Sequence, residues 1–103
     1  MTASNITLIA ELLETIFQEN REVLQELKIA NVIAGCKREH PVLEPLVVND
    51  DLSLDHGALQ DQPGAFRAFG SMIYTVGEYL EVFLGKEGSD QRISQAVKSF
   101  RSK

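Results

Sequence analysis

The chain has 103 residues, 44% of them hydrophobic and 24% charged, which fits one globular domain and argues against a two-domain or largely disordered protein. Its formal net charge is −5, so we predict neither a nucleic-acid nor a membrane partner, because both require basic surfaces. Cys36 is the only cysteine, no secretory signal is visible and no apolar run approaches the ~20 residues that span a bilayer, so the sequence predicts a cytoplasmic protein.

Residues 5–38 carry the strongest periodic pattern. Nine positions recur three and four residues apart: Ile6, Ile9, Leu13, Ile16, Asn20, Val23, Leu27, Ala30 and Ala34. This spacing places them on one face of a helix, and we predict a long N-terminal helix over 5–38. Such a helix would be about 50 Å long at ~1.5 Å per residue, whereas a domain of this size has a radius of gyration of about 13 Å. It therefore breaks, most plausibly at residues 28–31, or it projects and needs a partner.

Asn20 is the most specific feature of this apolar seam. Its spacing from Ile6 gives it an equivalent heptad position. One polar side chain there lowers stability but pairs with a copy of itself, which fixes register and oligomeric state. Three interpretations remain open: Asn20 specifies a self-associating helix, the helix bends near Asn20, or the residue forms hydrogen bonds within a monomeric core.

Residues 41–64 differ in character, because three prolines and the run Asn-Asp-Asp at 49–51 interrupt them. We predict an ordered connector with a possible short strand at 46–48, for which no partner is evident, and one short helical turn ending near Leu59.

A second helix is predicted over residues 65–84. Its apolar positions again repeat at three-four spacing: Phe66, Phe69, Ile73, Val76, Leu80 and Phe83. Gly85 and Gly88 provide a C-terminal stop. A short third helix over 90–102 follows, with Ser89 or Asp90 as its candidate cap.

Gly70 and Gly77 lie seven residues apart on one face of the second helix. Each glycine costs roughly 1 kcal/mol relative to alanine in a helix interior. Two of them on one face suggest that another backbone or a flat ligand comes close. We favour close helix packing, with a bound ligand as the alternative.

No residue pattern predicts catalysis, a metal or a cofactor. An EF-hand loop starting at Asp51 would have His56 at the required glycine and Gln62 at the required glutamate. Cys36, at the end of an apolar helix, is expected to be packed. The chain has no glycine-rich phosphate loop and no nucleophile elbow. We therefore predict no enzyme activity and no catalytic residue.

The sequence as a whole predicts a single all-α domain over 1–103, in which the two long helices pack antiparallel beside the short C-terminal helix. Because these make a thin core, we predict that a homodimer completes the bundle. The predicted interface comprises Ile9, Leu13, Ile16, Asn20, Val23, Leu27, Gly70 and Gly77. For function we predict a non-enzymatic protein–protein interaction or regulatory domain. The alternatives are a small-ligand or cofactor site beside Gly70 and Gly77, and an acidic inhibitor or chaperone of a basic partner.

Overall fold

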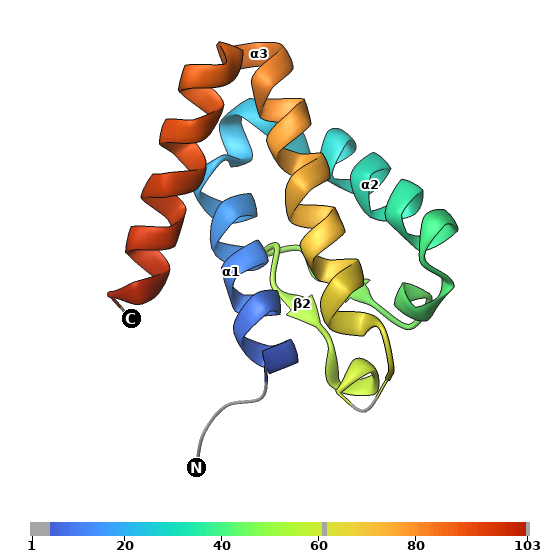
Figure 1. Cartoon of the computed structure of the whole chain (residues 1–103). Coiled ribbons are helices and arrows are strands. Elements are labelled where there is room, and N and C mark those ends of the chain that lie inside the picture. Colours follow the sequence, from blue (N-terminus) through green and yellow to red (C-terminus); the bar gives the residue numbers. More distant parts are fainter. Residues whose placement is uncertain (1–4, 61, 103) are drawn as a thin grey trace.

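The computed structural model describes residues 5–60 and 62–102, apart from the side chains of residues 26–28. Three helical elements dominate it (Figure 1): α1 (Asn5–Glu19), α2 (Arg21–Glu39) and α3 (Ala65–Arg101). Between α2 and α3 lie two 3-10 turns, η1 (Pro41–Leu43) and η2 (Gly57–Leu59), and two strands, β1 (Val47–Val48) and β2 (Leu54–Asp55). The expected mostly helical class is confirmed, with a very small hairpin in addition.

Element α3 is two helical arms rather than one rod. Gly85 has φ 76° and ψ 170°, which interrupts the helix and sends the chain back beside itself. We call residues 65–84 the first arm and residues 86–101 the second arm. With α1 and α2, the two arms make a compact four-helix arrangement with a radius of gyration of 13.0 Å. The predicted stop at Gly85 is confirmed, although helix resumes directly after it.

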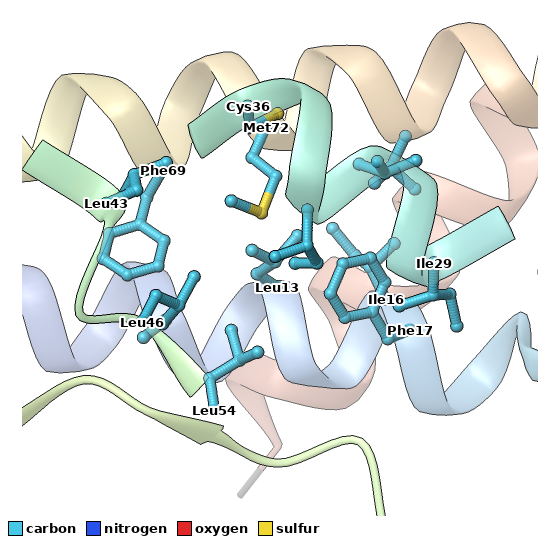
Figure 2. Packing of buried hydrophobic residues seen from close by; sticks show 14 of the residues in the cluster. Leu13, Ile16, Phe17, Ile29, Cys36, Leu43, Leu46, Leu54, Phe69 and Met72 are labelled. Atoms are coloured by element: carbon cyan, nitrogen blue, oxygen red, sulfur yellow. The ribbon is translucent and has the colours of Figure 1, made fainter. Parts of the chain in front are cut away.

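The core lies where α1 and α2 pack against α3. Leu13, Ile16 and Phe17 of α1 are fully buried, as are Phe69 and Met72 of the first arm. Figure 2 shows these side chains meeting one another and residues of the connector between the helices. One chain therefore covers the apolar stripe of α1 by itself.

The predicted long helix over 5–38 is interrupted at two places, and the expected break at 28–31 is wrong. Asn20 separates α1 from α2, and Gln25, with φ 57° and ψ 156°, interrupts α2 after one turn. At Asn20 the backbone N–H and the side-chain Nδ2 both donate to the Ile16 carbonyl, at 3.1 and 2.9 Å. The interpretation that the helix bends near Asn20, with its amide bonded inside the core, matches this geometry.

The break also changes the packing direction. In Figure 1, α2 runs opposite to the first arm of α3, whereas α1 runs in the same direction as that arm. Antiparallel packing of the two long helices is therefore right for α2 and wrong for α1, because the turn at residues 20–25 reverses the chain between them.

The connector is held against α1 by polar contacts. Val47 pairs with Asp55 and Val48 with Leu54 in an antiparallel hairpin. The backbone N–H of Leu54 donates to Glu14 Oε1 at 2.6 Å, so this α1 carboxylate fixes the hairpin. The strand predicted at 46–48 therefore has a partner, β2. A strand of two residues is too short to show a recognisable pattern in the sequence.

Candidate interaction groove

The acidic and histidine side chains of the connector form local hydrogen bonds in this fold. Asp51 Oδ1 accepts hydrogen bonds from the Ser53 N–H at 3.0 Å and the Ser53 hydroxyl at 2.6 Å, and these bonds lower the pKa of Asp51. His56 Nδ1 lies 2.8 Å from Gln60 Nε2. Within the described part of the chain, no group of three or more His, Cys, Asp or Glu residues could hold a metal ion.

Cys36 is a packed core residue. Its side chain is buried, and burial raises the pKa of the thiol. A thiolate is the reactive form of cysteine, so this environment suppresses nucleophilic chemistry at neutral pH.

A groove of about 530 Å³ lies between the two arms of α3, and we call it the arm groove. Its apolar lining comes from Ile73, Gly77 and Ile93, and its charged lining from Glu78, Glu81 and Asp90. Tyr74 also lines the groove and is 72% exposed, so its ring is available to a bound molecule. This combination of an apolar strip, an exposed aromatic ring and carboxylates is typical of a recognition surface.

The reversal of the chain at Gly85 creates the arm groove. Because the chain reverses, Glu78 and Asp90, which are twelve residues apart in the sequence, both line the arm groove. A Cβ placed on Gly88 would lie 2.8 Å from Leu84 Cβ, so the reversal needs a glycine at this position too. The Ser89 hydroxyl then donates to the Gly77 carbonyl at 2.9 Å and ties the second arm to the first. Ser89 is buried in this contact and does not act as the predicted helix cap.

The glycine face does not pack as predicted. A Cβ built on Gly70 or on Gly77 would meet no described atom of another element within 4 Å. The predicted close packing is therefore absent on the side where a Cβ of either residue would lie, although Ser89 of the second arm contacts the Gly77 carbonyl. At Gly77 the missing side chain instead opens the arm groove.

The electrostatics of the arm groove are one-sided. Three carboxylates line it, and no Lys or Arg among the described residues does. Asp90 also borders a shallower surface that carries Lys86 and Lys98, so the excess of negative charge is strongest toward Glu78 and Glu81. Neighbouring carboxylates of this kind attract a cationic group.

The eight residues predicted as an interface do not share one surface of the chain. Leu13, Ile16 and Asn20 are fully buried inside it, and Ile9 and Val23 are partly buried. The side chain of Leu27 lies outside the described residues. Gly70 and Gly77 belong to α3, and of the eight only Gly77 lines the arm groove.

The sequence reasoning missed Tyr74, Glu78, Glu81 and Asp90. A signal was available, because Tyr74 lies three and four residues before Gly77 and Glu78, and Glu81 lies four and three residues after them, which places all four on one side of the helix. Asp90 could not have been found in this way, because only the tertiary fold brings it there.

A second groove, of about 620 Å³, lies between α2 and β1. Ile33, Leu46 and Val48 contribute apolar surface to it. Its charged lining carries both signs, with Arg21 and Lys37 on α2 and Asp50 after β1, and it lacks the concentration of carboxylates found in the arm groove.

Two further findings bear on function. None of the described helices is long and apolar enough to cross a membrane. No family model, curated protein or solved structure matches the chain.

Proposed function

We propose that this protein is a non-enzymatic interaction domain that binds a basic, amphipathic segment of another protein in the arm groove. The single observation that carries the proposal is the composition of that groove, in which an open apolar strip at Gly77 is bordered by Glu78, Glu81 and Asp90. The net charge of −5 adds a long-range attraction for a basic partner.

The apolar strip supplies affinity and the carboxylates supply selectivity. Ile73 and Ile93 are partly buried against the core, so they present a fixed apolar surface rather than a mobile one. Tyr74 offers an aromatic face on which a Lys or Arg side chain can lie. An amphipathic helix places its apolar residues in such a groove and its basic residues along the rim. This proposal unites the interaction domain with the acidic partner of a basic protein, both predicted from the sequence.

A binding measurement with a synthetic peptide tests the proposal. The probe is an amphipathic helix of leucine and lysine, and its control has the same composition with the leucines scattered around the helix. We expect the amphipathic peptide to bind more tightly in calorimetry, and its affinity to fall as salt is added. Equal affinity for the two peptides would mean that net charge alone drives binding and would contradict the proposal.

Matched charge variants locate the site. The triple variant Glu78→Gln, Glu81→Gln, Asp90→Asn removes three charges from the arm groove, and we expect binding to weaken about tenfold or more. The control triple variant Glu11→Gln, Glu44→Gln, Asp50→Asn removes three exposed charges elsewhere and gives the same net charge. Equal loss in both variants would show that the arm groove is not the site.

The small-ligand alternative from the sequence predicts a different result at the same groove. A free polyamine would then compete with the peptide at similar concentration, because its charges would satisfy the carboxylates without need of the apolar strip. We expect a polyamine to compete only weakly.

A further inference from the structure

The turn between α1 and α2 contains a strained residue. Gln25 has φ 57° and ψ 156°, a backbone region that L-residues other than glycine rarely occupy. Leu52 also has a positive φ, but its side chain is only 4% exposed, so burial offsets the strain. The side chain of Gln25 is exposed and gains no such compensation. The strain at Gln25 is therefore relieved by any rearrangement that makes residue 25 helical.

The same turn leaves a buried polar atom without a partner. Asn20 is fully buried, and while its Nδ2 donates to the Ile16 carbonyl, its Oδ1 has no hydrogen-bond donor among the described residues. A buried acceptor without a donor is costly, because it has lost its water and gained nothing in exchange. The turn therefore contains two features that raise its free energy: the unpaired Oδ1 of Asn20 and, five residues later, the strained backbone of Gln25.

The amino-acid sequence of the turn does not itself encode a break. No Gly or Pro occurs between residues 5 and 34, and the three-four spacing of the seam continues without a skip through Ile16, Asn20 and Val23. Local preference therefore favours one continuous helix through residues 20–25. Packing inside the monomer holds the chain in the bent form instead.

A continuous helix cannot remain inside one copy of the protein. Residues 5–39 would extend for about 52 Å as one helix at ~1.5 Å per residue. The longest dimension of the folded chain is 36 Å. Straightening therefore lifts α1 away from α3 and exposes Leu13, Ile16 and Phe17, all of which are fully buried in the monomer. The surface that fits them best is the same α3 surface on a second copy.

We propose that this protein forms a domain-swapped dimer, in which residues 20–25 become helical and α1 of each copy packs on α3 of the other. Such an exchange preserves every α1–α3 contact and changes only the turn, which is where the strain lies. The two turns then meet at the two-fold axis. There Asn20 of each copy can supply the amide donor that the Oδ1 of the other lacks, as polar residues in helical seams do.

Glycine at position 25 tests the thermodynamic argument. Gln25→Gly removes the strain from the bent form and disfavours the continuous helix, so both effects shift the equilibrium toward monomer. The control Ala30→Gly places a glycine in a stretch of α2 that is helical in both forms. Size exclusion with light scattering, over a range of protein concentrations, measures the dimer. We expect Gln25→Gly to weaken dimerisation about tenfold or more and Ala30→Gly to leave it unchanged.

A crosslink tests the exchange of α1 directly. Gln60 Nε2 donates to Thr7 Oγ1 at 3.1 Å, so these side chains mark where α1 lies against the connector. In a Cys36→Ala background, Thr7→Cys with Gln60→Cys is treated with a short bismaleimide. The isolated dimer fraction should give chains joined to each other on a denaturing gel, and the monomer fraction should give chains joined only within themselves.

Three results would overturn the proposal. They are a wild-type chain that stays monomeric at every concentration, a dimer whose crosslinks all lie within single chains, and equal dimerisation of the wild type and Gln25→Gly. The peptide-binding experiments probe the arm groove, which no described residue of α1 lines, so neither set of results depends on the other.

Discussion

The Ser89 hydroxyl donates a hydrogen bond to the Gly77 carbonyl at 2.9 Å, across the chain reversal at Gly85. This bond joins residues on opposite sides of the arm groove. It fixes the separation of the two arms close to the reversal, and with it the width of the groove that Glu78 and Asp90 line.

Replacing Ser89 with alanine tests the role of this bond. We expect Ser89→Ala to lower the free energy of unfolding by ~1 kcal/mol, because the hydroxyl is lost from a partly buried hydrogen bond. Urea denaturation followed by circular dichroism measures the change. Ser94→Ala, on an exposed position of the same arm, is the control and should stay within ~0.5 kcal/mol of wild type. Equal effects of the two substitutions would mean that the Ser89 contact adds nothing to stability.

Gly77→Leu separates an open groove from a packed face. Since no described atom outside the helix lies near the position of a Cβ, we expect the melting temperature to stay the same or to rise, with up to ~1 kcal/mol from helix propensity. The leucine side chain should fill the arm groove and abolish peptide binding. Gly70→Leu is the matched control, because Gly70 is equally open but does not line the groove; it should retain binding. A marked loss of stability in both variants would restore the close-packing prediction.

Gly85→Ala should destabilise the protein by ~1–3 kcal/mol, because φ 76° with ψ 170° is a backbone conformation that alanine rarely adopts. The cost is purely conformational, since a Cβ at Gly85 would meet no described atom within 4 Å. Gly70→Ala is the control and should be neutral or slightly stabilising. Thermal and urea denaturation of the two variants give the comparison. A stability for Gly85→Ala equal to that of the control would show that the reversal does not require glycine.

The buried thiol of Cys36 predicts a pH dependence. Its pKa is raised above the ordinary value of 9.0 by burial, so the folded state binds the proton more tightly than the unfolded state. The associated stability is complete below pH 9.0 and is lost as pH rises through the folded pKa. We expect wild-type stability to decline more steeply above this pH than that of Cys36→Ala. In the native protein a thiol reagent should react slowly at neutral pH, and as fast as a free thiol only after unfolding; rapid native reaction would contradict the burial.

The sequence by itself determined where helix forms and which faces are apolar. The three-four spacing of residues such as Leu13, Ile16, Phe69 and Val76 identified positions that are fully buried, because a helix of fixed period turns spacing into a face. Gly85 marked the reversal of α3 because glycine alone tolerates that backbone conformation at little cost. Helical periodicity and the backbone freedom of glycine depend on neighbouring residues alone, so both can be predicted from the sequence.

The tertiary structure alone decided where the N-terminal helix bends and which side chains share a groove. Asn20 stood out as the one polar residue of the apolar seam, but the sequence left both a bend and a self-associating helix open, and nothing local separates Gln25 from its helical neighbours. The bend follows from burying α1 and α2 against the same α3, and packing outweighs the strain at one residue. Likewise Glu78 and Asp90 are, in sequence, ordinary polar residues on two predicted helices. They line one groove only because the chain folds back between them, and the burial of apolar surface drives that folding.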